Sequence, residues 1–315
     1  MFIGIEIGGT KIQLGLGRND GKLVGLYRGK VDVARGGNGI RETIVGAVPQ
    51  LLADAGILRT AVEGVGVGFG GPIDDRTRRV IRSHQIRGWD DFPLADWLAE
   101  SLKLPVTLGN DADVAGLAEA THGAGRGLSP LFYITVGSGI GGGLIVDGTI
   151  ARGTGRGAAE IGHLRIHTPT GYRTLEAISS GWGIAHRARE RLADGDGADS
   201  ILRNRTEIST PIVAGAAAAG DAFAARILDE CLDALAEAIC ATIALVCPQC
   251  VVIGGGVSLL GEGAFFVPLR AKVAARVFEP FAGLTAIVEA TLGEEVVVHG
   301  AIALAAGRAS GAGER

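Results

Sequence analysis

The sequence has few aromatic residues, no strong excess of one charge and no long apolar run. Aromatic residues make up only 5% of a chain that is 47% hydrophobic, so aliphatic side chains must form most of the core. The formal net charge of -4 provides no broad basic surface, which argues against a nucleic-acid partner. No apolar run approaches the roughly 18 residues of a membrane span, and no basic segment opens the chain. We therefore expect a cytoplasmic protein without a membrane partner.

Cysteines are also scarce, and the four present lie close together at Cys231, Cys240, Cys247 and Cys250. This spacing does not suit a disulfide framework and favours reduced thiols. Cys247 and Cys250 form a C-x-x-C pattern, but the second ligand pair of a zinc site and the surroundings of a redox motif are missing. Buried structural thiols are the simpler interpretation, and a role for this pair stays open.

Glycine, by contrast, is abundant, with 52 residues against 10 prolines in a chain of 315. This composition indicates a folded protein with many tight turns, and the length predicts two domains.

Residues 131–148 read as strand, glycine turn and strand, like a second copy of residues 2–17. A duplicated β-β-β-α-β-α domain is the economical interpretation, and two unrelated glycine-rich hairpins are the alternative. The other expected elements are strands over 2–7, 11–18, 22–33 and 250–258, a helix over 39–55 that Pro49 should kink or shorten, a loop over 149–180, helices to about 246, and a closing helix over 295–307.

Three glycine-rich turns follow predicted strands, at residues 8–11, 137–143 and 254–256. None matches G-x-G-x-x-G or G-x-x-x-x-G-K-[ST]. Glycine lets the backbone approach a ligand, and successive N–H groups then form an anion-binding concavity. Two hairpin turns could hold a polyphosphate from both sides, with Thr10 and Ser138 as hydroxyl donors, and the third turn could let adenine lie against the backbone. Each turn alone needs no ligand, but together they indicate a nucleotide.

An enzyme that transfers a group from a nucleotide also needs an acceptor site and a base. Asn110 and Asp111 lie where a predicted strand gives way to a helix, although a helix cap accounts equally for one of them. Asp113 could serve that first turn as readily. The segment GFGGPID, residues 68–74, ends another strand and could line a substrate.

Further polar side chains occur in the glycine-rich region that follows the second hairpin. Glu160, His163 and Glu176 could accept hydroxyl protons from a sugar, although surface residues of this kind need no ligand. His163 and His167 also invite a metal reading, but no neighbouring cysteine completes the four ligands of a structural zinc site.

Together these segments resemble the ROK (repressor, open reading frame, kinase) family of sugar kinases and repressors, within the actin-like, hexokinase-like ATPases. The resemblance runs from Gly4 to Ala306 and rests on IGGTK, GFGGPID, GND, TVGSGIGGG, EIGH with a downstream LE, AAAAGD and VVIGGGVS in that order. It implies an α/β fold of two ribonuclease H-like domains of β-β-β-α-β-α type that flank a central cleft. The smaller domain would comprise residues 1–108 with a C-terminal helix at about 295–315, and the larger one residues 109–294.

The resemblance also implies an activity, namely ATP-dependent phosphorylation of a hexose hydroxyl with Mg²⁺, Asp111 being the general base. Glucose is the first expectation; a kinase for an N-acetylated or other hexose and a catalytically weakened sugar or nucleotide sensor are the alternatives. Sugar and ATP would be the partners, and relatives are often homodimers. Positioning and charge neutralisation carry most of phosphoryl transfer, which suits glycine turns. The implied sugar ligands are Gly71, Asn110, Glu160, His163 and Glu176, and the implied ATP ligands are Gly9, Thr10, Lys11, Gly137, Ser138, Gly139, Gly255 and Gly256.

The chain departs from the family pattern at three places. Glu6 stands where the family commonly has the aspartate that helps to hold the magnesium shell, and its extra methylene moves the carboxylate by roughly 1.5 Å. Many members carry a C-x-C-G-x-x-G-C zinc segment between the residues that match His163 and Glu176; this chain lacks it, so we expect no zinc. The segment SHQIRG lacks the asparagine of a glucokinase-like member, so the identity of the sugar stays open. Repressors of the family carry a helix-turn-helix before the first strand, and we expect none here because that strand begins at Phe2.

Overall fold

The computed structural model describes residues 1–83 and 85–309. Contacts between Cα atoms divide the chain into two compact units. Unit 1 comprises Met1–Tyr133, Gly143–Ala158 and Ala290–Arg315, of which residues 310–315 lie outside the described part, and unit 2 comprises Ile134–Gly142 and Ala159–Glu289. The predicted domain division after residue 108 stays a prediction; the contact-defined unit 1 runs further because helix α3 (Asp111–Thr121) packs against helix α9 (Val296–Ala309).

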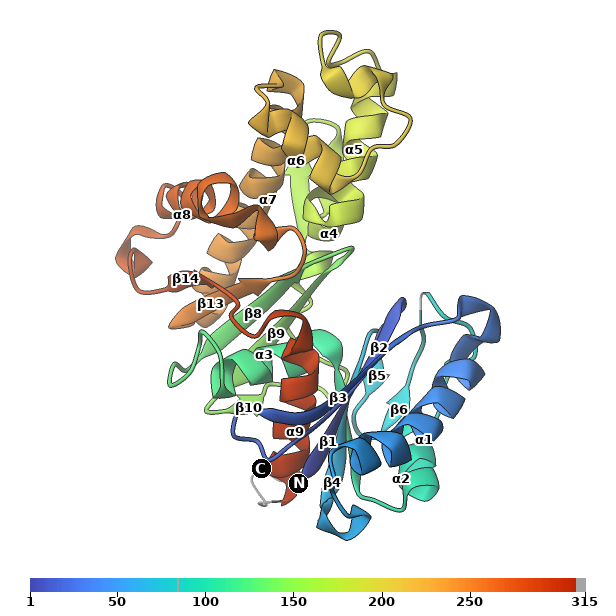
Figure 1. The fold of residues 1–315 in the computed structure, drawn as a ribbon. Coiled ribbons are helices and arrows are strands. Elements are labelled where there is room, and N and C mark those ends of the chain that lie inside the picture. The colour runs from blue at the N-terminus through green and yellow to red at the C-terminus, as the bar shows by residue number, and fades with distance from the viewer. Residues whose placement is uncertain (84, 310–315) are drawn as a thin grey trace. The chain divides into compact units, whose positions relative to one another are not determined.

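Unit 1 is built on a mixed five-stranded sheet with the strand order β3-β2-β1-β4-β7 (Figure 1). The first three strands pair antiparallel, and β1, β4 and β7 pair parallel. The predicted strands at 2–7 and 11–18 are confirmed as β1 and β2. The bounds are β1 Phe2–Ile7, β2 Lys11–Gly17, β3 Leu23–Lys30, β4 Gly64–Phe69 and β7 Val106–Asn110, with a small hairpin of β5 Ile73–Asp74 and β6 Arg79–Val80.

One face of this sheet carries glycines where helix α9 (Val296–Ala309) lies across it. A Cβ atom on Gly4 would overlap the carbonyl oxygen of Val298, and one on Gly66 would overlap that of Ala301. Only a residue without a side chain allows the helix backbone to approach the strands this closely. The glycine content of β1 and β4 therefore sets the position of α9.

Helices α1 (Gly36–Asp54) and α2 (Leu94–Leu102) cover the opposite face of the sheet (Figure 1). Aliphatic side chains are buried beneath them. Alternation along β1 directs Ile3, Ile5 and Ile7 into this core. The expected shortening at Pro49 is wrong, because α1 continues through this residue to Asp54. Buried Val48 and its neighbours hold that turn in place against the loss of one hydrogen bond.

The second sheet repeats the strand order of the first, as β10-β9-β8-β13-β14. Its β9 and β10 are antiparallel and its β13 and β14 parallel, like their counterparts in the first sheet. The predicted α/β fold with a duplicated β-β-β-α-β-α arrangement is therefore confirmed. The bounds are β8 Leu131–Val136, β9 Ile140–Val146, β10 Thr149–Ile150, β13 Cys250–Gly254 and β14 Ala286–Glu289.

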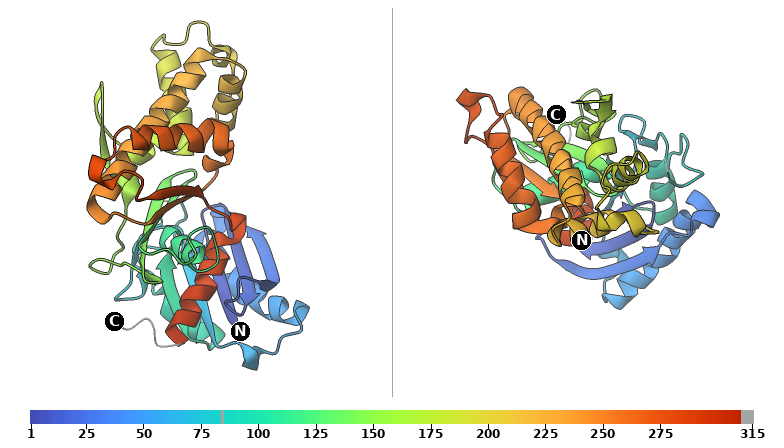
Figure 2. Two further views of the ribbon diagram at one scale, coloured as in Figure 1. Left: turned by 90° about the vertical axis from the view of Figure 1, so that its left-hand side faces the viewer. Right: turned by 90° about the horizontal axis from the view of Figure 1, so that it is seen from above.

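The helices of unit 2 gather around the 25-residue α7, and Figure 2 shows them from two further sides. The cysteines belong to this scaffold: Cys231 is buried in α7, Cys247 caps that helix at a φ of 44°, and Cys250 opens β13. Burial raises the pKa of the Cys231 thiol to about 12. None of the four cysteines is in a disulfide. The helices are α4 Leu175–Ser179, α5 Gly181–Ala193, α6 Thr210–Ala218, α7 Ala222–Val246 and α8 Val267–Ala274.

The expected loop over 149–180 is wrong for its second half, which forms the hairpin β11 (Arg165–Thr168) and β12 (Gly171–Thr174) followed by α4. Gly171, with a φ of 112°, closes the turn between strands too short for clear alternation. His167 lies in this hairpin with its ring against that of Tyr172. No helix in the described part of the chain has the length and apolar composition needed to cross a membrane.

Candidate active site

Asn110 and Asp111 lie at the junction of β7 and α3 (Asp111–Thr121). Asn110 is the helix cap: its Oδ1 accepts hydrogen bonds from the amides of Ala112, at 2.9 Å, and Asp113, at 3.4 Å. Its Nδ2 donates to the carbonyl oxygen of Gly71 at 3.1 Å. The capping interpretation is therefore correct for Asn110, and Asp111 beside it is partly exposed.

Gly70 brings the Asp111 carboxylate next to the first glycine turn. Its amide donates to the carbonyl oxygen of Ile7 at 2.8 Å, which joins the ends of β1 and β4. A Cβ placed on Gly70 would lie 3.3 Å from Oδ2 of Asp111 and 3.5 Å from Cα of Gly8. Asp111 and the turn that contains Gly9, Thr10 and Lys11 are thus neighbours within unit 1.

The turn itself is closed by a hydrogen bond from the Gly8 amide to the Lys11 carbonyl oxygen at 3.1 Å. Thr10 is exposed at its tip. The side chain of Gln85 lies directly against Gly9, so this glycine has no room for a Cβ atom. A ligand at the turn would therefore meet backbone amides and the movable end of Gln85.

Glu6 is 8% exposed and sits in a polar network beside this turn. Its Oε1 pairs with Nζ of Lys11 at 3.2 Å, and its Oε2 accepts a hydrogen bond from Nε2 of Gln13 at 3.0 Å. Both Lys11 and Gln13 also donate to the carbonyl oxygen of Glu294, just before α9. Burial raises the pKa of the Glu6 carboxyl, and the charge of Lys11 opposes that shift.

The residues around Glu6 bear on whether this site could hold a magnesium ion. The described residues include no group of three or more histidine, cysteine or acidic side chains placed to hold a metal. Mg²⁺ in sites of this kind keeps several waters and takes one or two carboxylates together with substrate phosphates. Glu6 supplies one carboxylate beside the turn, so the residues fit an ion that a triphosphate carries and that Glu6 helps to hold.

In unit 2 the turn Gly137–Gly139 is held against the start of α5. The amide of Gly181 donates to the carbonyl oxygen of Gly137 at 2.8 Å, and that of Trp182 to the carbonyl oxygen of Ser138 at 3.3 Å. The third glycine turn lies against the end of β8, because a Cβ atom on Gly255, which has a φ of 91°, would overlap the backbone of Val136. Val257 also donates its amide to the Val136 carbonyl oxygen at 2.9 Å. The predicted nucleotide residues of unit 2 thus lie together.

The two segments that carry the remaining predicted sugar ligands both contact Ile140, the first residue of β9. Glu176 accepts a hydrogen bond from the Ile140 amide through Oε2 at 2.8 Å. Glu160 and His163 are exposed at the two ends of one helical turn, and Gly162 within it packs on the Ile140 carbonyl oxygen. Glu176 therefore anchors the glycine turn, whatever else it binds.

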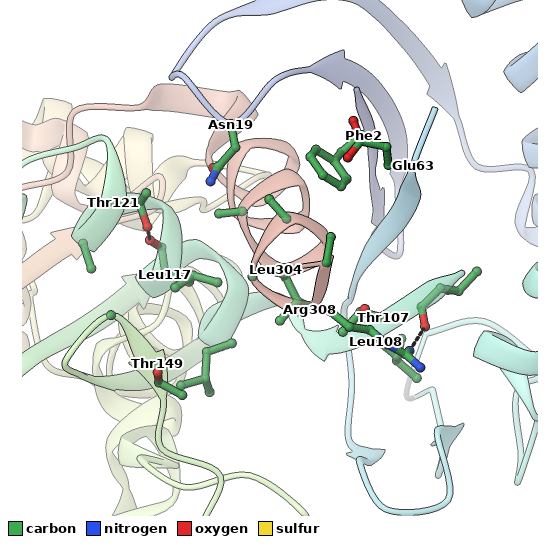
Figure 3. A pocket seen from close by; sticks show the side chains of 18 of the residues that line it. Phe2, Asn19, Glu63, Thr107, Leu108, Leu117, Thr121, Thr149, Leu304 and Arg308 are labelled. Atoms are coloured by element: carbon green, nitrogen blue, oxygen red, sulfur yellow. Dashed lines mark hydrogen bonds between the residues drawn. The ribbon is translucent and has the colours of Figure 1, made fainter. Parts of the chain in front are cut away.

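A separate cavity of about 1030 Å³ lies in unit 1 at the other end of β7 (Figure 3). Thr107 and Leu108 of β7, Thr121 of α3 and Leu304 and Arg308 of α9 are among its walls. The residues that line it include none of the predicted sugar or nucleotide ligands. It is therefore distinct from the candidate site at Asp111.

Comparison with known proteins places these features in a family. The family model described as "ROK family" matches residues 2–308. The chain belongs to the ROK family. A glucokinase of Halalkalibacterium halodurans is 32% identical to this ROK protein over 308 residues, which cover 95% of this chain and 93% of that one.

Solved structures of other ROK proteins share the fold. The ROK hexokinase of Thermus thermophilus aligns with a TM-score of 0.83 and 27% identity, covering 98% of this chain and 99% of that one. A ROK family glucokinase of Streptomyces griseus, solved in complex with glucose and AMPPNP, aligns with a TM-score of 0.76 and 29% identity over 97% and 99% of the two chains.

Sequence reasoning missed several members of the site. Gln13 lies directly opposite Glu6 in the β1–β2 hairpin, so the register of that hairpin was a usable signal. No local pattern pointed to the carbonyl oxygen of Glu294 or to Gly70 as the link between two strand ends. No sequence pattern indicated that Trp182 lies beside Ser138, because that contact depends on where α5 begins in the fold.

Proposed function

We propose that this ROK protein is an ATP-dependent hexokinase, acting on glucose first among hexoses, with Asp111 as the general base. The observation that carries the proposal is the position of Gly70, which has the Asp111 carboxylate on one side and the Gly8 turn on the other. A base for a sugar hydroxyl and a backbone suited to phosphate are what phosphoryl transfer to an alcohol requires close together.

Asp111 would take the proton from the hydroxyl group as that group attacks the terminal phosphoryl group of ATP. Its Oδ1 accepts a hydrogen bond from the Ala112 amide at 2.9 Å, which fixes the carboxylate orientation. In this proposal Asn110 and Gly71 contact the sugar, and Glu160, His163 and Glu176 are further hydroxyl partners.

The nucleotide would be held by backbone more than by charge. Gly9, Thr10, Lys11 and Gly137–Gly139 would bind the phosphates, and Gly255 and Gly256 would bind the adenosine. When bound with the triphosphate, Mg²⁺ would neutralise charge on the transferred group. Glu6 would accept a hydrogen bond from one of its waters.

The test replaces Asp111 with asparagine, which keeps the size of the side chain and removes its basicity. A general base contributes about 10²–10⁴-fold, so sugar-dependent ADP release by Asp111→Asn should fall by that order while AMPPNP binding persists. Asp54→Asn, at the exposed end of α1, is the matched control and should leave turnover unchanged. Unchanged turnover in Asp111→Asn would refute the assignment of the base.

The acceptor is identified by assaying wild-type protein with ATP and Mg²⁺ against a panel of hexoses and acylamino-hexoses. Preference for an N-acetylated hexose would support the alternative kinase. A weakened sensor is the other alternative, because both Glu6 oxygens are engaged. A large gain in turnover in Glu6→Asp would favour that alternative, and no gain would favour a competent kinase.

A further inference from the structure

Two large apolar side chains stand exposed on the segments that surround Val136 and the Gly137–Gly139 turn. Trp182, the second residue of α5, is 64% exposed, and Leu259, in the turn after Gly254–Gly256, is 76% exposed. Trp89, by comparison, is 1% exposed. An indole exposed to water lacks the stabilisation that burying its apolar surface would give. An exposed tryptophan beside a predicted ligand site is therefore a candidate for contact with that ligand.

The backbone of Trp182 is held firmly at this place. Besides its own bond to the Ser138 carbonyl oxygen, Ser180 caps the helix by accepting a hydrogen bond from the Gly183 amide at 2.9 Å. Ser180 and Gly183 are both buried, so the first turn of α5 cannot move away from the glycine turn without breaking this packing. The exposed indole is therefore carried by a rigid element and not by a loose loop.

The glycine turns offer a nucleotide no apolar surface of their own. Their N–H groups suit phosphate oxygens, but a purine base has two flat faces that gain most from aromatic or aliphatic contact. On the described segments 137–139, 181–183 and 254–260, Trp182 and Leu259 are the large apolar side chains that are exposed.

We infer that Trp182 stacks on the purine base of the bound nucleotide and that Leu259 forms a second apolar wall of the base site. This inference rests on the proposed function, since it takes Gly137–Gly139 as part of the nucleotide site. Trp182 would then favour a nucleotide over a phosphate chain that carries no base.

The first test uses the fluorescence of the protein itself. Of its three tryptophans, Trp89 is buried and Trp97 is half-buried, so Trp182 dominates the solvent-exposed emission. AMPPNP should quench the emission of wild-type protein and of the control Trp97→Phe, whereas inorganic tripolyphosphate, which has no base, should not. In Trp182→Phe the quenching should disappear.

The second test measures affinity by calorimetry. Loss of an aromatic stack on a base corresponds to roughly 5- to 150-fold weaker binding, so Trp182→Ala should weaken AMPPNP binding by that factor and leave tripolyphosphate binding unchanged. Trp182→Phe keeps an aromatic face and should retain most of the affinity. Leu259→Ala should weaken AMPPNP less, and Leu245→Ala, an 84% exposed leucine on α7, should have no effect.

The inference is overturned if AMPPNP binds without quenching Trp182, or if Trp182→Ala binds AMPPNP as tightly as wild type. It is also overturned if the emission changes with protein concentration alone, which would mark Trp182 as a contact between copies of the chain. These outcomes differ from failure of the proposed function, in which sugar-dependent ADP release is absent although AMPPNP still quenches.

Discussion

Glu119, on α3, offers the sharpest test of what holds unit 1 together. This residue is 0% exposed, and its carboxylate accepts hydrogen bonds from three backbone amides. Oε1 accepts from Thr291 at 2.9 Å and from Leu292 at 3.0 Å, and Oε2 accepts from Ala124 at 2.7 Å. It thereby ties the C-terminal half of α3 to the segment that leads into α9.

Glu119→Ala would leave these three amides without an acceptor. Each buried unsatisfied donor costs about 1–3 kcal/mol, and with partial relaxation we expect a total loss of roughly 3–5 kcal/mol. At about 2–4 °C per kcal/mol for a unit of this size, the melting temperature should fall by on the order of 10 °C. Glu119→Gln keeps one acceptor oxygen but turns an NH₂ group toward an amide donor, so its loss should be intermediate.

Thermal unfolding followed by circular dichroism measures this effect. Glu100→Ala and Glu100→Gln, on the exposed side of α2, are the matched controls and should melt close to wild type. If Glu119→Ala melts as Glu100→Ala does, the carboxylate is not the link between α3 and the segment before α9, and the reasoning is refuted.

Three further predictions concern the site and its support. Because burial raises the pKa of Glu6, the folded state holds this proton more tightly than the unfolded chain does. Relative to Glu6→Gln, wild type should therefore gain thermal stability as the pH falls through the raised pKa toward 4.5. A difference in melting temperature that stays constant across pH would contradict this. Gly66→Ala would press a methyl group into the α9 backbone and should destabilise by about 1–3 kcal/mol in urea unfolding. Gly46→Ala, in open space on α1, should instead stabilise by about 0.5–1 kcal/mol, and equal effects would speak against the close helix packing. Glu176→Ala should raise the KM for ATP, because the substitution frees the Ile140 amide that ends the glycine turn. A rise in the sugar KM alone would show that anchoring this turn is not the main role of Glu176.

The duplicated fold and most of the strand pattern were predictable from the sequence because they depend on local signals. Alternating apolar residues and the glycine breaks mark both hairpins whatever surrounds them. The hairpin at 165–174 was missed because its strands have only four residues each, too few for alternation to stand out. The shortening predicted at Pro49 was wrong because the packing of α1 outweighed the local cost of a proline within a helix.

At the site, the sequence alone determined which residue types were available: the glycine turns, the adjacent Asn110 and Asp111, and Glu6 in an unusual position. Only the tertiary structure decided their contacts. It assigned the cap to Asn110 and brought the Glu294 carbonyl oxygen to Lys11 from the far end of the chain. The contact between Lys11 and Glu294 joins residues that are 283 positions apart, and it arises from how helices and strands pack, which no local pattern encodes.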